Sequence, residues 1–218
     1  METATDTYLT VKGEAQSQFV EQRSRFISFI WHVTDADQVK DRLAELQKEY
    51  YDARHICYAY MLGPERTDWR ANDNGEPSGT AGKPILGQIN SAGLTDVLIA
   101  VVRYFGGVKL GTSGLTEAYR LGAAQVIEKA EVITAYVEQD VTVLFTYDMM
   151  NVVMKAAKEM DVTMVTQDWG QFYCEQSQRA FDCKMVFKAR LSAVNAFVEK
   201  LDGIASTQAE PELIIENL

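Results

Sequence analysis

The segment Val97–Gly114, with the sequence VLIAVVRYFGGVKLGTSG, decides the fold of the first part of this chain. It begins with six consecutive apolar residues, which is typical of a strand buried on both faces of a sheet. Four glycines within nine residues follow, and helically spaced apolar residues then predict a helix over Leu115–Ala130. Because α/β proteins place ligands where a buried strand leads into a helix, this turn is a candidate binding surface. The glycines equally allow the backbone to pack closely against another loop.

The residues before this segment predict a unit of mixed strands and helices. Alternating apolar residues within 8–33 predict two strands, paired as a hairpin through Gly13–Ser17. Asp35 is a suitable N-cap for a helix that extends to Tyr50. The remaining elements expected here are a strand over 55–62, a polar loop over 63–77, and a short helix from Pro84 to Gly93.

After about residue 135 the pattern starts again, which favours a second compact unit over one large core. We expect strands over 141–147, 162–166, 183–191 and 213–215, helices over 149–160 and 194–201, and a polar stretch over 171–179. This order, β-α-β-β-α-β, is that of a ferredoxin-like domain. The sequence therefore predicts an α+β fold with two domains, residues 1–135 and 136–218.

The composition indicates a globular protein with an acidic surface. The 218 residues are 47% hydrophobic and 24% charged, and the formal net charge is −10. Such a surface repels phosphate backbones, which disfavours non-specific nucleic-acid binding. Residues 103–125 are locally basic, with Arg103, Lys109 and Arg120 against Glu117. This asymmetry favours one defined anion-binding spot.

The cysteines and the N-terminus indicate a reducing compartment. Cys57, Cys174 and Cys183 form no Cys-x-x-Cys pair, and their odd number argues against a disulfide framework or a cysteine-rich zinc site. The acidic first residues do not resemble a signal peptide, and no apolar run approaches the roughly 20 residues of a membrane span. We therefore expect a cytoplasmic protein that does not enter a membrane.

A second glycine-rich segment, residues 72–84, has the sequence NDNGEPSGTAGKP. It is not a Walker A loop, because Pro84 follows Lys83 where that motif requires Ser or Thr. Small residues before a helix still allow backbone N–H groups to point at one anion, helped by the hydroxyls of Ser78 and Thr80 and the charge of Lys83. The plainer interpretation is a tight turn and helix cap without a ligand, and cap chemistry alone favours it.

The segment 103–114 lacks the Gly-x-Gly-x-x-Gly fingerprint of dinucleotide sites. Thr112 or Ser113 can cap the helix that follows. Arg103 and Lys109 add positive charge to the backbone donors of the loop. If the two glycine-rich segments converge, their main-chain donors and cations together suit an anionic group.

Two pairs of side chains are candidates for metal binding or catalysis. His55 and Cys57 lie two residues apart on a strand, but zinc needs three or four ligands and only His32 remains as another histidine. A hydrogen-bonding histidine is therefore favoured over a metal site. Asp73 and Glu76 suit acid–base or magnesium chemistry, although solvated carboxylates are favoured in a polar, turn-rich loop. We expect no metal and no cofactor.

Four stretches of the chain resemble the IMPACT (YigZ) family, in the order found there. They are Ser24-Arg25-Phe26-Ile27, Ala53-Arg54-His55-x-Cys57-x-Ala59-Tyr60, residues 76–84 and residues 103–111. The resemblance spans most of residues 17–130, and the C-terminal half is similar to the smaller domain of bacterial two-domain members. It implies a first domain like one in a small-subunit ribosomal protein and like domain IV of elongation factor G. The second domain would be like the last domain of that factor.

The resemblance implies a role in translation or its regulation, and no catalytic residues transfer with it. We expect a binding protein, with RNA, the ribosome or a translation-related protein as partner, and with phosphate or sulfate as an ion that the site would hold. Tyr104 would stack on a base. The expected binding residues are Arg25, His55, Glu76, Ser78, Gly79, Thr80, Gly82, Lys83, Arg103, Tyr104, Gly106, Gly107, Lys109, Gly111 and Thr112.

Two alternatives remain open at this point. The first is an enzyme that acts on a small phosphorylated or carboxylated substrate through His55, Asp73 and Glu76. The second is a protein-interaction module, whose glycine loops are structural and whose binding surface lies on exposed apolar patches elsewhere. The oligomeric state is open.

Overall fold

The computed structural model describes residues 6–175, 177–205 and 213–216. The chain is an α+β protein that divides into two compact units. The N-terminal unit is Thr7–Ala135, and the C-terminal unit begins at Tyr136 and includes Asp6. Within the described residues no helix is long and apolar enough to cross a membrane.

A five-stranded antiparallel sheet forms the centre of the N-terminal unit, with the strand order β2-β3-β6-β4-β5. Its strands are β2 (Glu14–Glu21), β3 (Ser24–His32), β4 (His55–Leu62), β5 (Asp68–Asn72) and β6 (Val97–Tyr104). The central strand β6 is buried along all but its last residue. This confirms the strand buried on both faces that the apolar run predicts.

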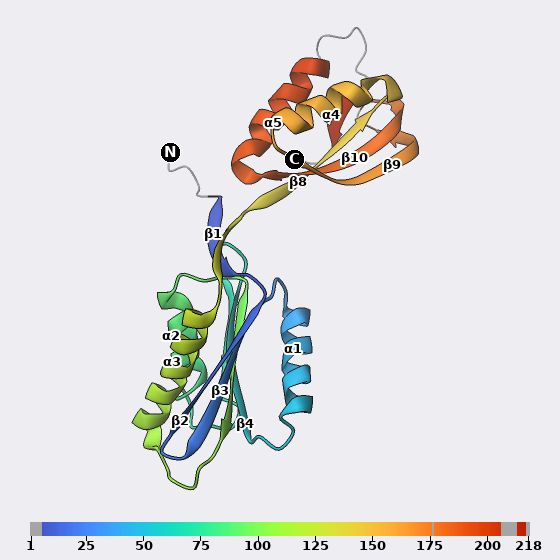
Figure 1. Cartoon of the computed structure of the whole chain (residues 1–218). Helices are drawn as coiled ribbons and strands as arrows, with labels where there is room; N and C mark the ends of the chain where they lie inside the picture. Colours follow the sequence, from blue (N-terminus) through green and yellow to red (C-terminus); the bar gives the residue numbers. More distant parts are fainter. Residues whose placement is uncertain (1–5, 176, 206–212, 217–218) are drawn as a thin grey trace. The chain divides into compact units, whose positions relative to one another are not determined.

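Helices cover both faces of this sheet (Figure 1). Helix α1 (Ala36–Glu49) lies on one face, and α2 (Gly82–Ser91) and α3 (Gly111–Lys129) lie together on the other. Successive side chains of β6 therefore enter two different cores. Those that face α2 and α3 are Val97, Ile99 and Val101, and those that face α1 are Leu98, Ala100 and Val102.

The C-terminal unit has a four-stranded antiparallel sheet with the order β11-β8-β10-β9. Its elements are β8 (Glu138–Phe145), η1 (Tyr147–Met149), α4 (Met150–Glu159), β9 (Thr163–Cys174), β10 (Arg179–Arg190), α5 (Leu191–Ala205) and β11 (Leu213–Glu216). The predicted order β-α-β-β-α-β is the order observed. Both helices pack their apolar residues into one core with the sheet.

Some predicted elements are wrong, and most of these lie at the edges of sheets. The predicted hairpin through Gly13–Ser17 is wrong, because β1 (Thr7–Val11) pairs with β7 (Val132–Tyr136) and the turn between β2 and β3 lies at Gln22–Arg23. The predicted polar loop contains β5, and the predicted polar stretch 171–179 contains the ends of β9 and β10. Edge strands carry many exposed polar side chains, so they lack the apolar signal on which prediction depends.

Candidate functional site

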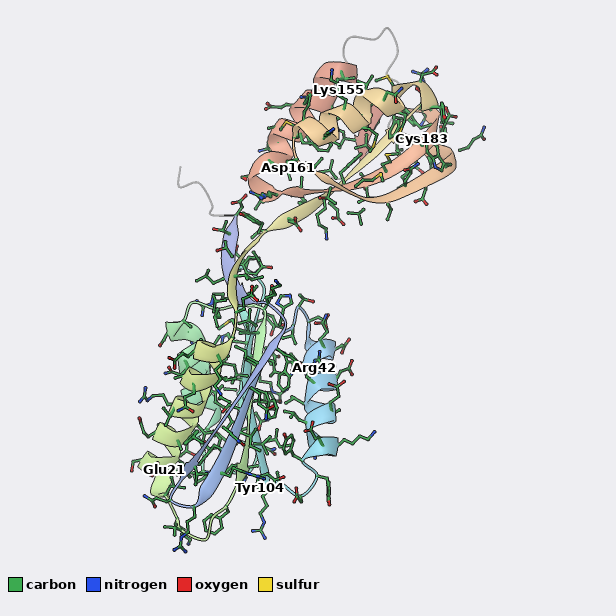
Figure 2. The ribbon with its side chains drawn as sticks, viewed as in Figure 1. Glu21, Arg42, Tyr104, Lys155, Asp161 and Cys183 are labelled. Atoms are coloured by element: carbon green, nitrogen blue, oxygen red, sulfur yellow. The ribbon has the colours of Figure 1, made fainter. Side chains whose placement is uncertain are left out.

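The two glycine-rich segments converge on one cleft of about 390 Å³ in the N-terminal unit. The cleft lies at the end of the sheet where β6 leads into α3, the end at which Figure 2 labels Tyr104. The residues that line it are Arg54, His55, Glu76, Pro77, Arg103, Phe105, Lys109, Leu110, Gly111, Thr112 and Leu115. The cleft thus combines apolar walls with cationic side chains and the start of a helix.

In the segment 72–84, the carboxylate of Asp73 already accepts the hydrogen bonds of the backbone amides. Asp73 Oδ1 accepts hydrogen bonds from the N–H groups of Ala81 (2.9 Å) and Gly82 (2.8 Å), and its Oδ2 accepts one from Gly79 (2.7 Å). The prediction that the amides of Gly79 and Gly82 face an external anion is therefore wrong. Burial raises the pKa of Asp73, but the hydrogen bonds from Gly79, Gly82 and Ala81 outweigh it, so the pKa lies below its ordinary value.

The other donors of this segment also lie outside the cleft. The Thr80 hydroxyl donates to the carbonyl of Pro77 at 2.6 Å. Ser78 and Lys83 are exposed, and neither lines the cleft. The structure therefore does not bring these three side chains into the cleft with the second segment.

A buried ion pair ties the two segments together. Arg103 Nη1 lies 2.7 Å from Glu76 Oε1, and the two side chains are only 7% and 4% exposed. The Tyr119 hydroxyl donates to the same oxygen at 2.8 Å. Glu76 is therefore not the solvated carboxylate that its loop predicts, and Arg103 is not a free cation, because each neutralises the other.

Behind this pair, polar side chains continue into the core. Cys57 Sγ lies 3.3 Å from Tyr119 Oη and 2.9 Å from the carbonyl oxygen of Asp73. Burial raises the pKa of the Cys57 thiol to about 12, and burial also raises the pKa of Tyr119. Cys57 is thus a protonated, inert thiol at neutral pH.

His55 lies on the same face of β4 as Cys57, but at the cleft. Its Nδ1 lies 2.9 Å from the carbonyl oxygen of Asn74. Because a carbonyl oxygen can only accept, Nδ1 carries the proton of this hydrogen bond. The Nε2 atom of His55 therefore remains an acceptor while the ring is neutral.

Helix α3 begins at the cleft without a capping side chain. Its N-cap is Leu110, and Thr112 and Ser113, which the sequence offers as caps, lie inside the helix instead. No acidic residue lies in the first turn of this 19-residue helix. Its first N–H groups consequently keep the partial positive charge of an unfilled helix N-terminus.

Two exposed cations line the cleft beside this helix start. Arg54 and Lys109 form no ion pair or hydrogen bond with any other residue in the described part of the chain. Arg54 was missing from the predicted binding residues, although it stands in the same short stretch as His55. With Lys109 it gives the cleft two uncompensated positive charges.

Arg25 and Tyr104 lie on the other face of the sheet, beside α1. The guanidinium of Arg25 lies 4.6 Å from the Tyr104 ring, and the Tyr104 hydroxyl donates to Asp52 Oδ1 at 2.6 Å. The prediction that Arg25 and Tyr104 join the same site as Lys109 is therefore wrong. The aromatic side chain at the cleft is Phe105, which the sequence analysis missed.

Two glycines of the segments allow backbones to touch. A Cβ atom on Gly106 would lie 2.0 Å from the carbonyl carbon of Arg23, and one on Gly82 would lie 2.5 Å from the amide nitrogen of Asn72. The Gly106 N–H also donates to Ser24 Oγ at 3.3 Å. Both glycines therefore have packing roles.

The fold and the cleft define a two-unit α+β protein whose N-terminal unit carries the candidate site. Among the described residues, no group of three or more His, Cys, Asp or Glu side chains is arranged to hold a metal ion. The Impact N-terminal domain family matches residues 22–127, which include both glycine-rich segments. The N-terminal unit therefore contains an Impact N-terminal domain.

Bacterial relatives of this family match the chain over about half their length. IMPACT family member YvyE of Bacillus subtilis is 40% identical over 113 residues, which are 52% of each chain. IMPACT family member YigZ of Escherichia coli is 39% identical over 110 residues, 50% of this chain and 54% of YigZ. A crystal structure described as that of a hypothetical protein matches 98% of both chains with a TM-score of 0.74 and 25% identity.

Proposed function

We propose that this chain is a binding protein of the IMPACT family that acts in translation or its regulation, and that its cleft contacts RNA phosphate. The observation that carries this proposal is the uncapped start of α3 beside Arg54 and Lys109, two cations without an internal partner. Amides at a helix N-terminus bind phosphate, because they point along the helix axis and carry partial positive charge. The translational context is supported by the family resemblance.

The acidic composition makes this contact a local one. With a net charge of −10, the chain as a whole repels a polyanion. Attraction must therefore come from a few groups at short range, where water and salt screen them least. Arg54, Lys109 and the first amides of α3 meet this requirement, because they line one cleft of about 390 Å³.

Salt-dependent binding of total RNA and purified ribosomes tests this function. Replacing Lys109 by Ala should weaken binding about two- to fivefold and reduce the salt slope by roughly one unit, because one phosphate contact is lost. Lys83→Ala is the matched control, since Lys83 is an exposed lysine of the other glycine-rich segment and does not line the cleft. Equal effects of the two variants, or no salt-sensitive binding by the unaltered protein, would contradict the proposal.

The enzyme hypothesis loses two of its three residues as bases in this geometry. Both carboxylate oxygens of Asp73 accept backbone hydrogen bonds, so Asp73 is not available as a base. Glu76 is neutralised by Arg103. Only the free Nε2 of His55 retains the character of a base at the cleft.

A protein-interaction role would instead use the C-terminal unit. Tyr147 and Trp169 are 66% and 49% exposed, and their ring centroids lie 5.7 Å apart. Exposed aromatic pairs are common at protein interfaces. Under this second candidate function, Trp169→Ala abolishes binding to a partner protein, and Lys109→Ala leaves that binding unchanged.

A further inference from the structure

The cleft contains more than an anion site, and the additional groups identify a class of ligand. Its floor holds the buried pair of Glu76 and Arg103, and its rim holds the exposed ring of Phe105. A phosphate ion alone would need neither an aromatic surface nor a hydrogen-bond acceptor. We infer that the cleft binds one ribonucleotide unit of an RNA, with its phosphate at the start of α3, its base on Phe105 and its ribose 2′-hydroxyl at Glu76.

The Phe105 side chain is held in place as a stacking surface. Its ring is 53% exposed, and the guanidinium of Arg103 lies 5.6 Å from the ring centroid. Arg103 is itself fixed by Glu76 and by the ring of Phe26, also at 5.6 Å. A base that stacks on a ring positioned in this way gains contact area without first ordering a flexible side chain.

Glu76 supplies an acceptor that the protein itself does not use. Both hydrogen bonds to its carboxylate, from Arg103 and Tyr119, end on Oε1. Its Oε2 has no hydrogen-bond partner among the described residues, although the side chain is only 4% exposed. A carboxylate oxygen that lines a cleft and accepts no hydrogen bond from the protein is available to a hydroxyl donor of a ligand.

The ion pair makes this acceptor compatible with a phosphorylated ligand. Arg103 lies 2.7 Å from Glu76 and cancels its charge, so the carboxylate does not repel a phosphate bound elsewhere in the cleft. A neutralised acceptor close to the stacking ring suits the sugar, which lies between base and phosphate in every nucleotide. The 2′-hydroxyl is the donor by which a protein distinguishes RNA from DNA.

The volume agrees with one nucleotide unit and not with a duplex. A cleft of about 390 Å³ lies within the range of roughly 300–1,000 Å³ that is usual for small-ligand sites. Sequence-tolerant stacking on one ring is typical of single-stranded RNA recognition. The contact is therefore with an unpaired nucleotide at an end or in a loop.

This inference rests on the proposed function, because both use the phosphate position at α3. Calorimetric titration of the full chain with inorganic phosphate, ribose 5-phosphate, the 5′- and 3′-monophosphates of adenosine, and their 2′-deoxy analogues separates the two. We expect one adenosine monophosphate to bind at least about tenfold more tightly than phosphate and about tenfold more tightly than its 2′-deoxy analogue.

A pair of neighbouring substitutions provides the matched protein control. Phe105→Leu should weaken the adenosine monophosphate about 5- to 100-fold and leave phosphate binding unchanged, since only stacking is lost. Tyr104→Leu removes the next aromatic ring on the opposite face of the sheet and should change neither affinity. Both positions are partly exposed, so the variants are expected to fold.

Each other outcome overturns a defined part of the inference. If phosphate and all nucleotides bind equally, and Phe105→Leu has no effect, the cleft is an anion site only and the proposed function survives without this ligand. If nothing binds, phosphate included, both fail together. Preferential binding of a short peptide through its free carboxylate would replace the ribonucleotide by a protein partner.

Discussion

The two glycine-rich segments of this protein have similar compositions and opposite chemistry. In residues 72–84, the closed segment, the carboxylate of Asp73 accepts hydrogen bonds from the amides of Gly79, Ala81 and Gly82. In residues 103–114, the open segment, no side chain caps the amides at the start of α3. Glycine therefore marks where a backbone can present donors, and the position of a nearby acid decides whether those donors are free.

The closed segment nevertheless contributes to the open one. Glu76 comes from the closed segment and Arg103 from the open one, and their buried pair fixes the distance between them. Pro77 adds a wall to the cleft. The first segment is thus a scaffold, and the second carries the available positive charge.

The largest expected effect on stability tests the close approach of the open segment to the turn between β2 and β3. A methyl group at Gly106 would lie 2.0 Å from Arg23, so Gly106→Ala must displace the β2–β3 turn. We expect a loss of about 3 kcal/mol or more in the free energy of unfolding, measured with urea. Gly107→Ala is the control, because Gly107 has open space and a φ of 88°, and it should cost about 1 kcal/mol. Equal costs would show that the close approach is unimportant.

The next largest effect on stability is expected when Asp73, which closes residues 72–84, is removed. Asp73→Ala removes the acceptor of three amides and should cost about 2–3 kcal/mol in the free energy of unfolding at neutral pH. The amides then become free, so phosphate should stabilise this variant more than it stabilises the unaltered protein. Asp68→Ala, at an exposed position of β5, is the control. Absence of a phosphate effect specific to Asp73→Ala would contradict the role assigned to the carboxylate.

The same carboxylate gives the stability a defined pH dependence. Because the folded-state pKa of Asp73 is lowered, its contribution is complete above the unfolded value of about 3.9. It is lost as the pH falls through the folded-state pKa. Unfolding midpoints measured from neutral to acid pH should therefore converge for the unaltered protein and Asp73→Ala. A constant difference between the two curves would contradict this assignment.

A smaller effect tests the link between the segments. Tyr119→Phe removes the hydroxyl that donates to Glu76 and should cost about 1–2 kcal/mol in the free energy of unfolding. Phosphate affinity should not change, since Tyr119 does not line the cleft. A loss of affinity without a loss of stability would place the hydroxyl in the binding site.

The smallest expected effect on stability comes from adding an acidic side chain at the start of α3, which would close the open segment as Asp73 closes the other. Ser113→Asp places a carboxylate in the first turn of α3, where it should stabilise the protein by about 0.3–1 kcal/mol. The same charge should abolish phosphate binding at the cleft. Ser113→Asn is the matched neutral control and should retain binding. Phosphate binding that survives in Ser113→Asp would show that α3 is not the anion site.

The sequence predicts those parts of the fold that depend on local patterns. The apolar run of β6, the cap of α1 by Asp35 and the element order of the C-terminal unit all follow from periodicity and turn chemistry. Strands β5 and β7 were missed, because few of their residues are buried and the apolar signal is weak.

The chemistry of the site could be predicted only in part, because its bonds join distant residues. Glu76 and Arg103 are 27 positions apart, and nothing local shows that they neutralise each other. The separation of Tyr104 from the cleft was predictable, since neighbours on a strand face opposite sides and cannot share a site with Arg103. The same rule leaves Phe105, just beyond the strand, as the aromatic candidate.

Backbone amide chemical shifts during a phosphate titration test the central claim most directly. We predict saturable shifts at Gly111, Thr112 and Ser113, and none beyond the control level at Gly79, Ala81 and Gly82, whose N–H groups already bind Asp73. The reverse pattern, or the same response in both segments, would contradict the distinction between an open and a closed glycine-rich segment.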